Sequence, residues 1–399
     1  MEMNSEKSAR LEKEKGLPFL IWLVVISTLG AGFFGGTVVL GYNISGYAWL
    51  VPFFVAFTVF FKGVGRLRFP LGLWMPWIAV VAGYLVFSDA ENALQRSTML
   101  LCPIFIGMAV STLNLTEQDL FKFRRIYRYI AIVLYIEVVL KSGLLLTGKL
   151  PATMGLAPQV MTGALVCSLF ATNYMYGEKK DILWWSALAA IPVIGVTRMG
   201  MIATGISLPL TFAPMKIAKR IVLVAMIVAA GYAIFLSERV QHKMFFSGRG
   251  SVEDIASNNP NLATYGRKEV WARLQVEIEE QPWFGHGSNE SETFIKKTSK
   301  LEHPHNDWLR LLYDYGYVGT VIFGLCVLLQ MLHLIKTGTR FSGERRILFF
   351  GAATSFISFL LFMFTDNIIL YVAFFGNLQF TIIGFAYASA ATVEDQKIA

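Results

Sequence analysis

The histidines of this chain gather in one segment, where their spacing could support acid–base chemistry. Four of the five lie between residues 237 and 306, and His303 and His305 come just before a predicted helix. A neutral imidazole near the positive end of a helix can accept a proton from a hydroxyl group. A histidine pair can also bind a metal ion, although no HExxH motif, cysteine pair or acidic triad accompanies this one. A third interpretation, two ordinary surface histidines, fits the same spacing.

Two arginines could bind an anion. Arg198 follows Thr197 between two apolar runs, where an ionisable side chain is costly unless it has a function or reaches the lipid headgroups. Arg267 lies one turn before Trp271 on a predicted helix. The helix dipole does not favour a cation at this end, although an exposed arginine there would need no partner. Because planar guanidinium groups bind phosphates in a bidentate manner, the two arginines could form a phosphate or diphosphate site.

Together these residues suggest a group-transfer reaction. Diphosphate is a good leaving group, and two arginines could stabilise its developing charge in place of a metal ion. A sugar hydroxyl is far too weakly acidic for histidine to ionise it beforehand, so proton transfer would have to accompany bond formation. The meeting of Arg198, Arg267 and His305 in space is a prediction that rests on their shared outward side.

Long apolar runs must position these residues. The chain has 399 residues, of which 55% are hydrophobic and 16% charged, and its mean hydropathy is +0.54. A soluble domain of this size could not bury so much apolar surface. We predict an all-α polytopic membrane protein with about 12 spans, since a helix needs about 20 apolar residues to cross a bilayer. The spans are expected at about 17–41, 47–61, 71–87, 97–113, 126–147, 156–176, 181–197, 200–215, 220–236, 317–335, 346–365 and 367–387.

The basic residues indicate an orientation. With a cytoplasmic N-terminus, the cytoplasmic segments carry 21 lysines and arginines, and the short outward segments carry only Arg96, Lys141, Lys149 and Arg198. This asymmetry predicts that both termini are cytoplasmic, with the first span uncleaved. Because the net charge of +8 comes from residues between spans, it does not indicate a nucleic-acid partner. The three cysteines fall inside apolar runs and imply no disulfide framework.

One long polar segment, residues 237–306, faces outward in this topology. Thr264 to Glu280 has the pattern of an amphipathic helix that Pro282 stops, and a second helix is expected to begin near Asn306 and to end or kink at Gly316. The predicted organisation is therefore spans one to nine in 1–236, a loop with the catalytic residues in 237–306, and spans ten to twelve with the C-terminus in 307–399.

The spacing of these residues resembles that of the O-antigen ligases and related O-antigen polymerases of Gram-negative bacteria. That family has His followed by Asn, Ser or Gln, nine residues and Gly-x-x-Gly, and it also has Gly-Arg-x-x-x-Trp, Pro-x-x-Gly-x-Gly and an outer Ser/Thr-Arg. The matching residues here are His305-Asn306 with Gly316 and Gly319; Gly266-Arg267 with Trp271; Pro282, Gly285 and Gly287; and Thr197-Arg198. By motif the resemblance covers roughly residues 180–387.

The resemblance implies an activity and roles for these residues. The donor would be a polysaccharide on undecaprenyl diphosphate, the acceptor a sugar hydroxyl of the lipid A core, and the place the periplasmic side of the bacterial inner membrane. The enzyme would be a metal-independent, inverting glycosyltransferase of the GT-C type without a cofactor. His305 would be the base, with Arg198 and Arg267 on the diphosphate. Asn306 would orient the histidine or, preferably, cap its helix. Trp271 and His303 complete the candidate substrate-binding set.

Three alternatives remain. An O-antigen polymerase would use the same donor, but polymerases typically have two substantial outer loops and only one is expected here. A protein O-oligosaccharyltransferase tends to be longer at its C-terminus. A transporter of twelve spans would predict paired broken helices and charges buried in mid-span, and Glu137 is the only carboxylate well inside a run. These comparisons favour the ligase.

Overall fold

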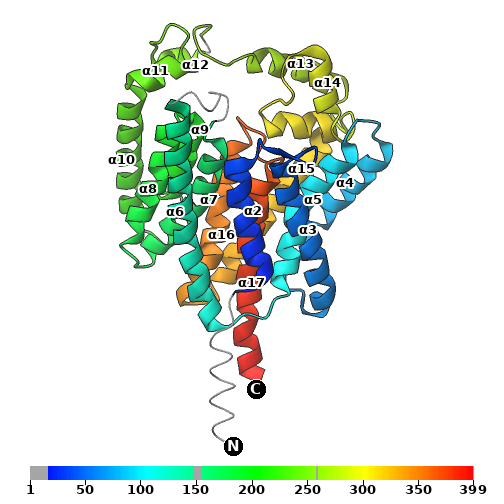
Figure 1. The fold of residues 1–399 in the computed structure, drawn as a ribbon, viewed down its shortest axis with the longest axis vertical. Coiled ribbons are helices and arrows are strands. Elements are labelled where there is room, and N and C mark those ends of the chain that lie inside the picture. The colour runs from blue at the N-terminus through cyan, green and yellow to red at the C-terminus, as the bar shows by residue number, and fades with distance from the viewer. Residues whose placement is uncertain (1–16, 147–154, 258, 399) are drawn as a thin grey trace, which may run out of the picture.

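The computed structural model describes residues 17–146, 155–257 and 259–398, and it is predominantly helical (Figure 1). The first half of the chain forms helices joined by short segments. In chain order the elements are α2 (Phe19–Phe34), β1 (Val38–Val39), β2 (Tyr42–Asn43), α3 (Ile44–Gly63), η1 (Val64–Arg66), η2 (Leu71–Leu73), α4 (Met75–Phe87), α5 (Ala93–Ser111), α6 (Glu117–Leu146), α7 (Ala157–Met175) and α8 (Asp181–Ile194). The two short strands pair antiparallel, with Val38 opposite Asn43.

The second half contains the outward segment and the last long helices. Its elements are α9 (Arg198–Ser207), α10 (Ile217–Phe235), α11 (Glu238–Met244), α12 (Val252–Ala256), α13 (Arg267–Glu280), α14 (Glu290–Thr298), α15 (Asp307–Gly338), α16 (Gly343–Phe362), η3 (Val372–Gly376) and α17 (Asn377–Ile398). Helices α11 to α14 lie at the same end of the molecule, with α11 and α12 on one side of it and α13 and α14 on the other, and the C-terminal end of α17 lies at the opposite end (Figure 1).

Within the described residues, six helical segments are long and apolar enough to cross a membrane: Ile44–Arg66, Ala93–Ser111, Ile217–Phe235, Asp307–Gly338, Gly343–Phe362 and Val372–Ala390. The chain therefore has the character of a polytopic membrane protein. Every one of the predicted runs contains a helix, but α9 has only 10 residues and ends at Ser207, well before the end of the run predicted at 200–215. Pro209 lies just beyond its end and cannot continue the helical hydrogen bonds. The total of twelve spans stays a prediction, and residues 1–16 and Lys149, used in predicting the topology, lie outside the described residues.

The helices differ sharply in how deeply they are packed. Helix α7 is buried along nearly its whole length, from Gln159 to Asn173, and it packs against α8 and α16. Helix α10 has no buried residue and lies at the edge of the molecule (Figure 1). Hydropathy alone does not separate these cases, because lipid-facing and protein-facing apolar side chains contribute equally to it.

The kink expected in α15 is confirmed at Gly316, whose φ of 63° and ψ of −170° interrupt the helix. Residues 282–287 cross the break and supply its hydrogen-bond partners. The His286 N–H donates to the Tyr313 carbonyl at 2.8 Å, and the Tyr317 N–H donates to the Pro282 carbonyl at 2.8 Å. Gly285 also has a positive φ, of 69°, and a Cβ atom on either glycine would collide with the backbone at the crossing. This contact gives a structural reason for a glycine in both motifs, because the two backbones touch and leave no room for a Cβ atom.

Helices α13 and α14 pack onto the first part of α15 through a small apolar cluster of Val270, Leu274, Ile278, Ile295 and Tyr313. The amphipathic pattern predicted the apolar face of α13 correctly. The helix begins at Arg267 and not at Thr264, because Gly266 precedes it with a left-handed φ of 80°. Helix α14 was missed, since its stretch is strongly charged and carries few apolar residues. The missed helix carries Glu292, which contacts His303.

Candidate functional site

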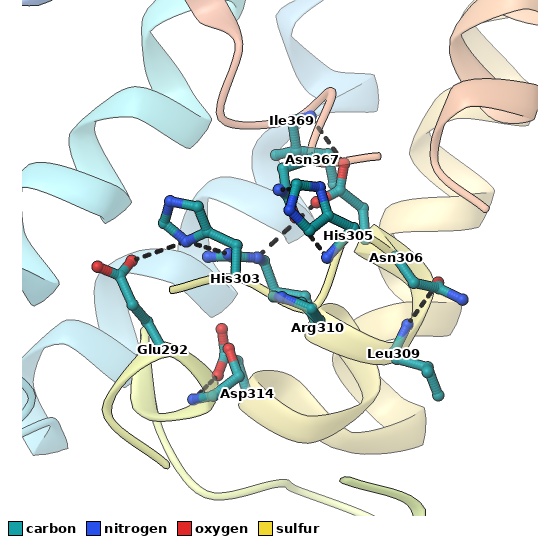
Figure 2. Close-up of polar contacts among 12 residues, drawn as sticks. Glu292, His303, His305, Asn306, Leu309, Arg310, Asp314, Asn367 and Ile369 are labelled. Atoms are coloured by element: carbon teal, nitrogen blue, oxygen red, sulfur yellow. Dashed lines mark hydrogen bonds and ion pairs between the residues drawn. The ribbon is translucent and has the colours of Figure 1, made fainter. Parts of the chain in front are cut away.

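His305 lies directly before α15 and is held by the connection between α16 and η3 (Figure 2). Its backbone N–H donates to Asn367 Oδ1 at 3.0 Å. The ring nitrogen Nδ1 lies 3.3 Å from Asn367 Nδ2 and 3.6 Å from Asp366 Oδ1. Every contact recorded for the ring within the described residues is at Nδ1, which leaves Nε2 for a substrate.

The backbone of His305 is fixed in a left-handed conformation, with φ of 50°. This conformation costs about 1 kcal/mol or more for a residue other than glycine, so its neighbours must impose it. The Trp271 Nε1–H donates to the Pro304 carbonyl at 2.7 Å on one side. On the other side, Asn306 Oδ1 accepts from the Leu309 N–H at 3.1 Å, which confirms the predicted cap of α15. Trp271 and Asn306 thus position the histidine, and their contact with a substrate stays a prediction.

The two neighbours of Nδ1 favour different tautomers of His305. A hydrogen bond donated by Asn367 requires a bare Nδ1 and places the proton on Nε2. A hydrogen bond to the Asp366 carboxylate requires the proton on Nδ1 and leaves a lone pair on Nε2. Only the second tautomer can act as a base at Nε2, so Asp366 is the neighbour that would support that chemistry.

Sequence reasoning missed Asp366 and Asn367. Both follow the predicted span 346–365 and come far from the histidines in the sequence, at the start of the next apolar run. The available signal was the polar sequence Thr365-Asp366-Asn367 between two apolar stretches, on the side predicted to face outward. An acidic residue at such a boundary is a functional candidate on the same argument that selected Arg198.

His303 belongs to a separate buried network (Figure 2). Its Nδ1 accepts from Arg310 Nη2 at 3.3 Å and lies 3.6 Å from Glu292 Oε2. Glu292 in turn forms two contacts with Arg96, of 3.0 and 3.1 Å. Burial and the charge of Arg310 lower the pKa of His303 far below its usual value, so the ring is neutral at pH 7. Figure 2 shows the His303 ring turned toward Glu292 and the His305 ring toward Asn367, so the two histidines have different surroundings.

The two predicted arginines lie at the same end of the molecule as His305. Arg267 Nη1 donates to the Thr365 carbonyl at 3.0 Å, which places it on the connection that holds His305. Arg198 Nη2 donates to the Ala263 carbonyl at 3.3 Å. Burial and the positive charge of Arg267 lower the pKa of Arg198. The charge of Arg267 thus reaches Arg198, but the two side chains donate to different carbonyls, and the meeting of Arg198, Arg267 and His305 stays a prediction.

Neither arginine forms an ion pair with a carboxylate within the described ranges. Both donate to neutral backbone carbonyls, although Arg198 is partly buried and near a like charge. Such an arrangement is costly unless an anion joins it. The same part of the chain contains no group of three or more His, Cys, Asp or Glu side chains that could hold a metal ion.

An apolar groove of about 700 Å³ opens beside Arg198. It lies between α8, α9, α10 and α11, and it exists because α10 stands away from the packed helices. Its lining is mainly apolar and also includes the cation Arg198; the apolar residues include Trp185, Val193, Met201, Ile227 and Met244. No pattern in the sequence predicts the position of this groove. Its shape and composition suit a long apolar chain with a negative group at one end.

The comparison with known families covers this part of the chain. Residues 182–324 match the family described as O-antigen ligase. The resemblance seen in the motifs is thereby confirmed for this region, which contains Arg198, Arg267, Trp271, His303, His305 and Asn306. Asp366 and Asn367 lie outside the matched residues. No curated protein matches the chain.

Proposed function

We propose that this protein is an O-antigen ligase, which transfers O-antigen polysaccharide from undecaprenyl diphosphate to a sugar hydroxyl of the lipid A core. The supporting observation is that Arg267, which lacks a carboxylate partner among the described residues, donates to the connection that holds His305, while its charge also reaches Arg198. Cations without a carboxylate partner near a positioned imidazole would suit transfer from a diphosphate.

In this reaction the acceptor hydroxyl attacks the anomeric carbon of the donor sugar, and His305 Nε2 takes the hydroxyl proton as the new bond forms. The bond from the anomeric carbon to the phosphate oxygen breaks, and its electron pair leaves with the diphosphate. The Asp366 carboxylate, whose Oδ1 lies 3.6 Å from Nδ1, stabilises the imidazolium that forms. A single displacement of this kind inverts the anomeric centre.

The groove beside Arg198 supports a lipid-linked donor. An apolar groove of about 700 Å³ has room for a substantial part of a prenyl tail. Burying each CH₂ group of that tail would contribute about 0.8 kcal/mol to the binding free energy. Arg198 at its lining would bind the diphosphate at the head of the chain. Tail and head would then fix the anomeric carbon relative to His305.

The direction in which the site faces follows from charge. The lysines and arginines cluster on segments that the topology assigns to the cytoplasm, whereas residues 237–306 lie on the other side. We expect this end of the molecule to face the periplasm of the inner membrane, where both lipid-linked substrates could reach it from the outer leaflet.

A polymerase or a protein O-oligosaccharyltransferase of the same superfamily is the alternative. Each would use the same donor, so the cations, the groove and the base would serve it equally well. The single long outward segment, 237–306, favours the ligase. A choice among the three depends on the acceptor.

The deciding experiment is complementation of cells that lack their own ligase, with the wild type and His305→Ala compared at equal abundance. A ligase restores long chains on the lipid A core, and His305→Ala leaves polymer on its carrier lipid. Restoration of polymer length on the carrier alone would identify a polymerase. Full activity of His305→Ala would refute the assignment of the base.

A further inference from the structure

Helix α11 connects the apolar groove to the cationic site. Val240 and Met244 line the groove, and Lys243 between them extends its Nζ to the Gly195 carbonyl at 3.1 Å. Gly195 lies in the turn that leads into Arg198. One short helix therefore carries both groove lining and a cation toward the same point.

Packing and hydrogen bonds fix α11 against Arg198. Val196, next to that turn, packs in an apolar cluster with Val240 and Met244. The Met244 carbonyl accepts from the Ala263 N–H at 2.8 Å, and the Ala263 carbonyl accepts from Arg198. Lys243 thus stands beside Arg198 through two independent sets of contacts.

The electrostatics of Lys243 resemble those of the two arginines. Desolvation and the charges of Arg198 and Arg239 lower its pKa. The ion pairs recorded for the described residues do not include Lys243. Lys243 is thus a third cation near the two arginines, and these like charges repel one another. Such an arrangement indicates a ligand with more negative charge than two arginines can neutralise.

The chemistry of the transfer supplies that additional charge. In the donor, each phosphate of the diphosphate is esterified and carries one negative charge. When the bond to the sugar breaks, its electron pair stays on the terminal phosphate, which gains a further negative charge. The two positive charges of Arg198 and Arg267 equal the two negative charges of the donor. One more cation would balance the additional negative charge of the leaving group.

We propose that Lys243 is a third cation of the diphosphate site, and that it binds the leaving group more strongly than it binds the intact donor. This inference rests on the proposed function. An interaction that strengthens as the bond breaks accelerates the reaction, whereas equal binding of donor and product would not.

The test compares two ligands on the purified full-length chain in lipid nanodiscs. One is undecaprenyl diphosphate and the other is undecaprenyl diphosphate with a sugar attached, so they differ by the charge in question. Lys243→Met, which keeps the apolar stem, should weaken binding of undecaprenyl diphosphate by about tenfold or more, the loss expected for one charge-assisted hydrogen bond. It should change binding of the glycosylated lipid by less than about twofold.

Two further variants complete the test. Lys243→Arg should restore preference for the free diphosphate. Arg249→Ala removes a positive charge from an exposed part of the same segment and should bind both lipids as the wild type does. Equal weakening for both lipids, or none, would overturn the role of Lys243 and leave the proposed function standing. If the wild type bound neither lipid, the proposed function would fail, and the inference with it.

Discussion

The two sides of the candidate site are built in opposite ways. Around the histidines, charged groups are buried and matched: Arg310 is 3% exposed, Glu292 is 3% exposed, and both find partners inside the protein. Around the groove, cations donate only to backbone carbonyls, and α10 has no buried residue. The chain thus neutralises the buried charges beside His303 internally, whereas the cations beside the groove have no carboxylate partner among the described residues.

The largest effect should come from breaking the matched side. Replacing Arg310 by Met removes the cation that lies 3.8 Å from buried Asp307 and donates to His303. Uncompensated buried charges cost about 3–5 kcal/mol of folding free energy. We expect Arg310→Met to lower the thermal unfolding temperature of the purified protein strongly. Arg198→Met, on the open side, should leave it nearly unchanged. Similar decreases in unfolding temperature for Arg310→Met and Arg198→Met would contradict the proposed difference between the two sides of the site.

Asp366→Asn should reduce catalysis and leave the fold intact. The carboxylate is the only neighbour of His305 described here that can hold a proton on Nδ1, and an amide in its place favours the unreactive tautomer. The transfer rate should fall by about 100-fold or more, with little change in donor binding. Initial rates at saturating donor would measure this. Wild-type rates for Asp366→Asn would show that the proton reaches His305 by another route.

Filling the groove should weaken donor binding. Gly231 on α10 lines the groove, and a Cβ atom there would meet open space. Gly231→Phe would place an aromatic ring in the space that we propose for the tail. We expect about tenfold weaker binding of a polyprenyl diphosphate, equivalent to one or two buried CH₂ groups. Met226→Phe, on an exposed part of the same helix, is the matched control. Equal affinities for both variants would argue that the tail binds elsewhere.

The smallest effect concerns how the free energy of unfolding depends on pH. Because the folded-state pKa of His303 is lowered, the unfolded chain takes up a proton below about pH 6.5 while the folded chain does not. The free energy of unfolding should therefore decrease as the pH falls below 6.5, by at most about 1.4 kcal/mol per pH unit. His303→Gln should flatten this dependence between pH 6.5 and 5 in denaturation experiments. An unchanged slope would mean that folding does not lower the pKa of His303.

The sequence predicted the parts of this molecule that depend on local pattern. The apolar face of the helix within 264–280, the cap at Asn306 and the break at Gly316 follow from the pattern of apolar residues and from residue types that determine backbone conformation, although the start of that helix at Arg267 was not predicted. Motif spacing also selected Arg198, Arg267 and His305. The prediction failed where distant segments meet: Asp366 contacts His305 only after α15 and α16 have packed, and Lys243 resembles an ordinary loop lysine until α11 packs on the turn before Arg198.

The order of synthesis gives the contact between His305 and residues 365–367 a further meaning. Arg198, Arg267 and His305 are all translated before the connection that holds the histidine ring and accepts from Arg267. A chain whose last helices have not yet entered the bilayer has these side chains but lacks the contacts of Asp366 and Asn367 with the histidine ring. We therefore expect the proposed transfer activity to appear only when the final segment is in place.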